Sequence, residues 1–110
     1  MKLPGAERAI VDLAKLSDYC LNPDHPRGQH KARVFASVLG ITADQAEDLR
    51  AILLTAAYQE EAVPGQVDNY GERYTIDFEV QMPVSKAWLR SSWIVHTDED
   101  FPRLVTCYVL

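Results

Sequence analysis

Cysteine is scarce in this chain of 110 residues, which contains only Cys20 and Cys107. Two cysteines without a spacing motif are too few for a disulfide framework or a zinc site. Cys20 lies in a helical pattern and Cys107 at an apolar position of a strand pattern. We therefore expect two reduced, buried thiols.

Long hydrophobic runs are also lacking, since no apolar stretch approaches the length that crosses a bilayer. The N-terminus has Pro4, Glu7 and Asp12 where a signal peptide needs an unbroken apolar segment. We predict a cytoplasmic protein that does not associate with membranes.

Motifs for phosphate loops and metals are missing as well. The five glycines are scattered, and the sequence contains neither HExxH nor CxxC. The acidic stretch "TDEDF" lacks the spacing and the terminal glutamate of a calcium loop. We expect no cofactor and no metal.

The formal net charge of -5 argues against nucleic-acid binding by long-range attraction. Two windows nevertheless contain no acid at all, residues 25–43 and residues 80–97. The first carries Arg27, Lys31 and Arg33, and the second carries Lys86, Arg90 and His96. If the windows meet in the fold, they form one positive face on an acidic body.

The first half of the chain has the periodicity of three helices. Asp12 can cap a helix over residues 13–22, and a second over residues 28–39 ends at Gly40, a residue that favours the left-handed stop. Thr42 and Gln45 have capping-box spacing before a third helix that runs to Gln59. A short apolar stretch at residues 9–11 has the character of a strand.

From Val63 onward the apolar period changes to two, which indicates strands. We expect strands near residues 65–68, 73–81, 87–97 and 103–110. The prediction is one α+β domain over residues 1–110, with three N-terminal helices packed on one face of a mostly antiparallel four-stranded sheet. The other face stays open.

Strand parity assigns side chains to the two faces. On the last two strands the packed face should hold Leu89, Ser91, Trp93, Val95, Val105, Cys107 and Val109. The open face should hold Trp88, Arg90, Ser92, Ile94, His96, Leu104, Thr106 and Tyr108. A single bulge would invert this assignment beyond the point where it occurs.

These residue types suit a metal-independent ribonuclease, which needs a base for the ribose 2'-hydroxyl, an acid for the leaving oxygen and cations around the phosphate. The candidate catalytic residues are His30, Lys31, Arg90, Ser92 and Thr106. The candidate substrate-binding residues are Arg27, Arg33, Trp88 and Tyr108. Each also has a structural explanation as a solvated or packing residue, and Arg33 also as a partner for the acidic third helix.

Three sequence blocks, "KLSDYCLNPDHPRGQHKARVF", "RSSWIV" and "PRLVTCYVL", resemble a bacterial family catalogued as the domain of unknown function DUF6883. The resemblance runs from Leu3 to Leu110. It implies functional roles for Lys31, Arg90 and Thr106, and a position among toxin-type domains. The order of helices followed by a sheet is also similar to the group of barnase, EndoU, colicin E5/D and RelE-like RNases.

The same chain is open to a second interpretation, in which it is a non-catalytic antitoxin, immunity factor or anti-defence inhibitor. Its acidic third helix and the "TDED" loop would then occupy a basic surface on a protein partner. The partner is therefore RNA under the first hypothesis and a protein under the second. The direction in which the helix acids point relative to Arg90 is the feature that bears on this choice.

Overall fold

The computed structural model describes all residues from Met1 to Leu110, with a helical half before a sheet. The helical half comprises η1 (Ala6–Arg8), α1 (Leu13–Lys15) continuing as the π-helical turn η2 (Leu16–Cys20), α2 (Gln29–Val34) continuing as the π-helical turn η3 (Phe35–Leu39), and η4 (Ala43–Gln45) leading into α3 (Ala46–Gln59). The strands are β1 (Val63–Asp68), β2 (Gly71–Gln81), β3 (Lys86–His96) and β4 (Pro102–Val109). The predicted α+β class is confirmed.

The local signals that start and stop the helices act as predicted. The Asp12 carboxylate accepts a hydrogen bond from the Ala14 N–H at 3.0 Å at the start of α1. Gly40 has a φ of 68°, so it ends η3 in the left-handed conformation that glycine tolerates best. Thr42 and Gln45 form a capping box, with the Thr42 N–H donating to Gln45 Oε1 at 3.0 Å.

The loop before α2 is fixed by His25. Its Nδ1 accepts hydrogen bonds from the backbone N–H groups of Arg27 at 3.0 Å and Gly28 at 3.1 Å. The Tyr19 ring meets the His25 ring edge-on, with centroids 4.7 Å apart. A Cβ at Gly28 would lie 2.5 Å from the Tyr19 carbonyl oxygen, so only glycine fits there. The loop thereby sets where α2 begins.

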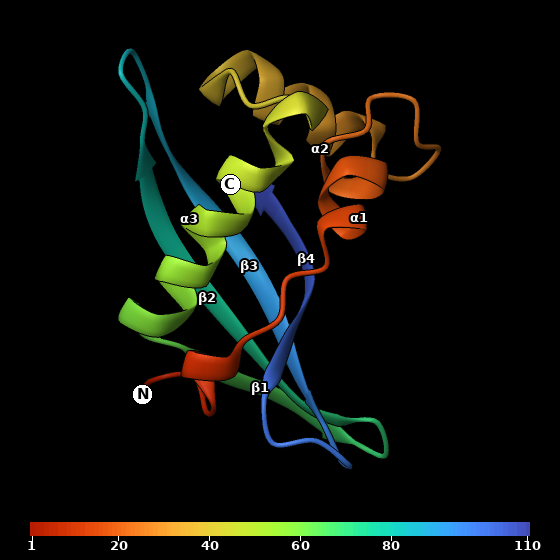
Figure 1. Cartoon of the computed structure of the whole chain (residues 1–110), viewed down its shortest axis with the longest axis vertical. Helices are drawn as coiled ribbons and strands as arrows, with labels where there is room; N and C mark the ends of the chain where they lie inside the picture. Colours follow the sequence, from red (N-terminus) through yellow and green to blue (C-terminus); the bar gives the residue numbers. More distant parts are fainter.

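The four strands form an antiparallel meander in the order β1-β2-β3-β4. β2 and β3 pair along their full lengths, from Gly71 opposite His96 to Gln81 opposite Lys86. β1 pairs only with the first part of β2, up to Thr75 opposite Val63. The remaining half of β2 therefore has a neighbour on one side only (Figure 1).

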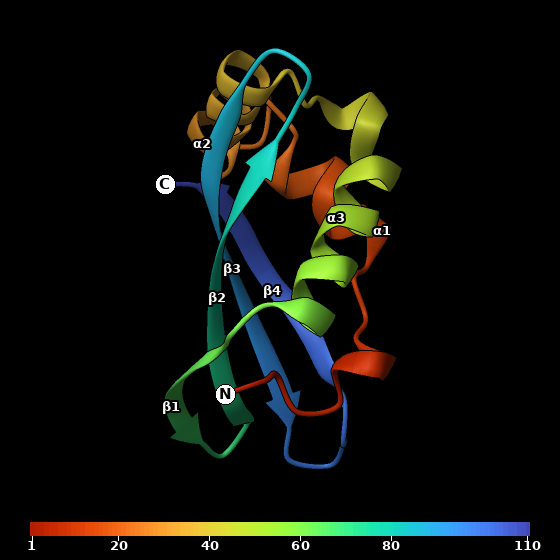
Figure 2. The ribbon, with the colours of Figure 1, turned by 90° about the vertical axis from the view of Figure 1, so that its left-hand side faces the viewer.

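One face of the sheet packs against α1 and α3, as Figure 2 shows from the side. The apolar residues that β2 was predicted to bury are buried: Tyr74, Ile76, Phe78 and Val80. In β3, Trp93 is fully buried, and its Nε1–H donates to Ser91 Oγ, which donates to the Ile76 carbonyl. The buried serine therefore has partners for both its donor and its acceptor functions.

A bulge between β3 and β4 makes part of the parity prediction wrong. Ser92 pairs with Thr106, but the next residue, Trp93, pairs with Leu104, which leaves Val105 as the extra residue. Beyond this point the faces of β4 are exchanged. Leu104, predicted for the open face, is buried, and Val105, predicted for the core, is exposed.

Ile94 is a second exception, because it is buried although it was assigned to the open face. Its cross-strand neighbours are Arg73 on β2 and Arg103 on β4. Long arginine stems can cover an apolar neighbour while the charged heads stay in water. Parity places Ile94 correctly, and the shielding by adjacent side chains decides its burial.

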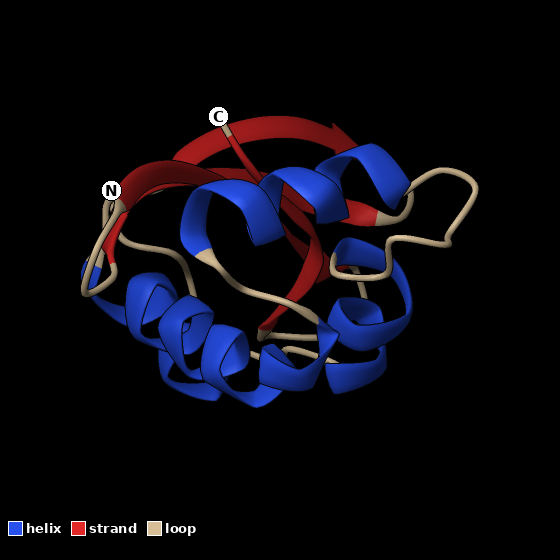
Figure 3. Ribbon diagram, turned by 90° about the horizontal axis from the view of Figure 1, so that it is seen from above, coloured by secondary structure: helices blue, strands red, loops and turns tan.

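The outer edge of β4 is covered along both halves. Ile10 forms a parallel bridge with Arg103, so the predicted strand at residues 9–11 is reduced to one bridging residue. α2 contacts the upper part of β4, and η3 contacts β3. Figures 1 and 3 show α2 with η3 running across the upper end of the sheet. No helix is both long and apolar enough to span a bilayer.

Candidate functional site

The open face of the sheet carries two neighbouring rows of polar side chains, set by strand register. Each row crosses β2, β3 and β4. The residues are Asp77, Arg90 and Tyr108 in one row, and Thr75, Ser92 and Thr106 in the other. Residues that lie far apart in the sequence therefore share one surface.

Arg90 and Asp77 form a two-pronged ion pair in the first row. Arg90 Nε donates to Asp77 Oδ1 and Arg90 Nη2 donates to Asp77 Oδ2, both at 2.8 Å. These bonds lower the pKa of Asp77 and, with a further contribution from the Tyr108 hydroxyl, raise the pKa of Arg90. Asp77 uses two of the five guanidinium N–H groups, and the others face the Tyr108 hydroxyl or solvent.

Lys31 reaches this row from α2. Its Nζ lies over the Tyr108 ring, 4.6 Å from the ring centroid, which is cation–π geometry. Tyr108 is in turn the cross-strand neighbour of Arg90. The first turn of α2 and the middle of β3 therefore meet at one phenol ring, with a cation on either side of it.

Three other predicted residues form no hydrogen bond, ion pair or cation–π contact with this group. His30 and Arg27 are exposed, and neither side chain has a hydrogen-bond or ion-pair partner. Arg33 Nη2 donates to Gln29 Oε1 at 3.3 Å and lines a different hollow together with Asp44. These three residues belong to the surface of α2 and its loop, not to the row of Arg90.

The remaining candidates lie on or beside the rows. Trp88 is on the open face with 53% of its surface exposed, two residues from Arg90 on β3. Ser92 and Thr106 are half-buried cross-strand neighbours. The Thr106 hydroxyl lies 3.9 Å from the Cys20 sulfur, so it is partly engaged by η2.

Asp77 is the member of this group that sequence reasoning missed. It stands on the wet side of the strand pattern, but only the β2–β3 register shows that it faces Arg90. Its carboxylate neutralises one of the two cations, so this face is not purely positive. None of the molecule's hollows is lined by Lys31, Arg90 or Tyr108, so the group forms a surface and not a pocket.

The two thiols adjoin this surface from the core side. Cys20 and Cys107 are buried and free, as the sequence indicated. A hydrogen bond from Cys107 lowers the pKa of Cys20, while the same neighbour and burial raise the pKa of Cys107. One proton of the pair is therefore released before the other. No group of three or more His, Cys, Asp or Glu side chains is arranged to hold a metal ion.

The family model for the domain of unknown function DUF6883 matches residues 2–110. The chain belongs to the DUF6883 family. Comparison with curated proteins and with solved structures gave no match. The family therefore covers nearly the whole chain, and the arguments about function rest on the geometry of the open face.

Proposed function

We propose that this DUF6883 domain is a small, metal-independent ribonuclease-like domain that binds RNA phosphodiesters on the open face of the sheet. The observation that carries the proposal is the meeting of Lys31 and Arg90 at Tyr108, with Nζ 4.6 Å from the ring centroid. Cations placed around a phosphate stabilise the charge that accumulates on it in the transition state. An exposed Trp88 beside them offers a platform for stacking a base.

The proposed reaction is a transesterification within the RNA. A base takes the proton of a ribose 2'-hydroxyl, the 2'-oxygen attacks phosphorus, and the bond to the 5'-oxygen breaks as that oxygen receives a proton. The products are a 2',3'-cyclic phosphate and a 5'-hydroxyl end. Lys31 and the remaining N–H groups of Arg90 would hold the phosphate.

Two residues compete for the proton-transfer role. The Tyr108 ring lies under Lys31 and opposite Arg90, whereas His30 stands next to Lys31 in sequence but is exposed. We assign the protonation of the leaving 5'-oxygen to Tyr108, while a water molecule takes the 2'-hydroxyl proton and Ser92 and Thr106 assist from the next row. Tyr108→Phe keeps the ring under Lys31 and removes the hydroxyl, so it should abolish cleavage while His30→Ala retains it.

The test is incubation of the purified chain with a mixed RNA pool in EDTA, with cleavage followed by gel electrophoresis. The Lys31→Ala, Arg90→Ala double variant should lose cleavage. The matched control is Lys2→Ala, Arg8→Ala, which removes the same charge from two exposed residues of the N-terminal segment that pair with Glu61 and Asp100. Equal faint cleavage by parent and double variant would show a contaminating nuclease and contradict the proposal.

A second candidate function, an acidic binding protein, is favoured by the acids around the start of α3. Asp44, Glu47 and Asp48 are exposed and have no ion-pair partner. The "TDED" loop is different, because Glu99 pairs with Arg103 and Asp100 pairs with Arg8. Asp98 is the only acid of this loop without an ion-pair partner, so the acids at the start of α3 form the larger unpaired group. Co-purification of a basic protein, lost in the variant with all three acids changed to Asn or Gln, would support this candidate.

A further inference from the structure

The second half of β2 presents a strand edge that no other strand covers. β3 pairs with β2 as far as Gln81, whereas β1 pairs with it only as far as Thr75. Apart from β3, no segment forms a backbone hydrogen bond with residues 77–81. Alternate residues of such a strand point their N–H and C=O groups outward. We call residues 77–81 the free β2 edge.

The other edges of the sheet are protected, which sets the free β2 edge apart. β1 contains Pro64 and an irregular register between Pro64 and Val67, both of which hinder pairing with a further strand. β4 is bridged by Ile10 and contacted by α2. The free β2 edge has neither proline nor bulge, and its register with β3 is continuous.

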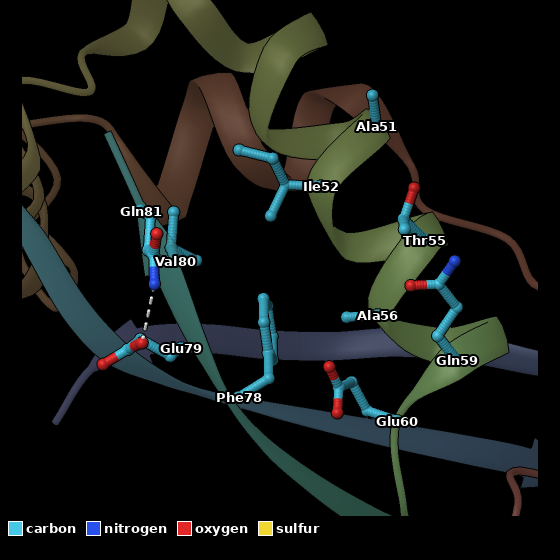
Figure 4. Close-up of a pocket in the computed structure, with 10 residues that line it drawn as sticks. All are labelled: Ala51, Ile52, Thr55, Ala56, Gln59, Glu60, Phe78, Glu79, Val80 and Gln81. Atoms are coloured by element: carbon cyan, nitrogen blue, oxygen red, sulfur yellow. Dashed lines mark hydrogen bonds between the residues drawn. The ribbon is translucent and has the colours of Figure 1, made fainter. Parts of the chain in front are cut away.

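A groove of about 400 Å³ runs between the free β2 edge and α3. Ile52, Thr55 and Ala56 line it from α3, and Phe78 lines it from β2 (Figure 4). Glu60 lies at the end of the groove where α3 stops. A strand added along the edge would place every second side chain into this groove, half of whose lining residues are apolar.

The other side chains of an added strand would lie on the open face, where Glu79 stands. Figure 4 shows Glu79 and Gln81 on the side of β2 turned away from α3. Glu79 and Glu60 have no ion-pair partner, and no cationic side chain lines the groove. A second copy of the chain would bring its own unpaired Glu79 to this edge, where like charges repel. The charge pattern selects a cationic occupant instead.

We propose that the free β2 edge and its groove bind an extended, cationic peptide segment of a partner protein, which adds to the sheet as a further strand. Backbone hydrogen bonds to the free edge hold the segment. Its apolar side chains enter the groove beside Phe78, and its Lys or Arg side chains face Glu79. This surface is separate from Lys31 and Tyr108, so the inference does not depend on the proposed ribonuclease function.

The test uses a six-residue peptide of alternating lysine and valine, titrated into the isotope-labelled chain and followed by amide chemical shifts. Saturable shifts are expected at residues 76–81 and along the groove side of α3. The same peptide N-methylated at alternate residues keeps its charge but cannot donate to the edge, and should bind at least about tenfold more weakly. Equal binding of the two peptides would show charge attraction alone and overturn the proposal.

Two substitutions test the site from the protein side. Glu79→Lys should weaken binding about fivefold, because it replaces an attractive cross-strand pair with a repulsive one. Asp98→Lys makes the same charge change on an exposed loop residue without an ion-pair partner, and should leave binding within about twofold. Thr55→Arg fills the groove and should abolish binding, with the amide spectrum confirming that the variant is folded.

The remaining outcomes count against the proposal. Absence of saturable binding by the lysine–valine peptide would show that the free β2 edge does not bind an extended cationic segment. Shifts centred on Asp44 and Asp48 would place the peptide on the acidic start of α3. Self-association of the free chain that Thr55→Arg abolishes would make a second copy the occupant.

Discussion

The two faces of the sheet are made by alternate residues of the same strands, yet they are held together in different ways. On the packed face, Leu89 and Trp93 have no exposed surface. On the open face, Arg90 and Asp77 hold each other by two charge-assisted hydrogen bonds and remain partly exposed. Apolar burial provides most of the folding free energy, whereas exposed ion pairs contribute little.

Polar side chains on the open face can therefore be replaced without disturbing the core, whereas those on the packed face cannot. Ser91 and Ser92 show this in adjacent positions. Ser91 is fully buried between the Trp93 Nε1–H and the Ile76 carbonyl, so its hydroxyl is part of the core. Ser92 is half-buried in a row of hydroxyls on the open face, so its side chain keeps some contact with solvent.

The largest difference between the faces should appear at the two tryptophans. Trp93→Ala removes a fully buried ring and should reduce the free energy of unfolding by about 3–5 kcal/mol. Trp88→Ala removes a ring with 53% of its surface exposed, and should change the free energy by only about 0.5 kcal/mol. Urea denaturation followed by circular dichroism measures both. Similar losses for the two variants would contradict the contrast between the faces.

The next effect concerns the loop that carries α2 to the open face. Gly28→Ala would place a Cβ 2.5 Å from the Tyr19 carbonyl oxygen, and should reduce the free energy of unfolding by about 1–3 kcal/mol. Gly65→Ala is the matched control, because its Cβ would lie 3.5 Å from the nearest atom, the Arg73 carbonyl oxygen. The control should be close to neutral. A neutral Gly28→Ala would mean that the loop does not fix the start of α2.

The features that could be predicted from the sequence are those with local causes. The caps at Asp12 and Thr42 and the stop at Gly40 depend on residues within one helical turn. The alternation of β2 is unbroken, so its buried and exposed sides follow directly from parity. The α+β class followed from the change of period at Val63.

The features that could not be predicted depend on register between strands. The bulge opposite Ser92 exchanges the faces of β4, and no glycine or proline in the sequence marks it. The pairing of Asp77 with Arg90 requires the register of the β2–β3 hairpin, which the turn at residues 82–85 sets. Charge and the family resemblance group Lys31 with Arg90, but the contact of Lys31 with Tyr108 depends on how α2 docks on β4.

A smaller effect tests whether Lys31 belongs energetically to the open face. Lys31→Met keeps an apolar stem over Tyr108 and removes the ammonium, so it should cost about 0.5–1 kcal/mol of unfolding free energy. A double-mutant cycle with Tyr108→Leu isolates the pair, and the coupling energy should be of the same size. Lys86→Met, on an exposed residue at the start of β3, is the control and should show no coupling to Tyr108. A coupling energy near zero for Lys31 and Tyr108 would show that their contact does not stabilise the folded chain.

The smallest effect is the pH dependence that Asp77 adds. Arg90 lowers the pKa of Asp77 in the folded chain, so this carboxyl binds its proton less readily when folded than when unfolded. Its stabilising contribution is therefore fully present above the unfolded pKa of about 3.9 and is lost as the pH falls through the lower folded pKa. The parent should be slightly more stable than Asp77→Asn at pH 6, and the difference should shrink below about pH 4.

Because other carboxyls titrate in the same range, the quantity to measure is the difference in urea midpoint between parent and variant at each pH. Asp98→Asn, which removes an acid without an ion-pair partner, should give a difference close to zero throughout. A gap between parent and Asp77→Asn that widens on acidification would reverse the sign and show that Asp77 is not stabilised by Arg90.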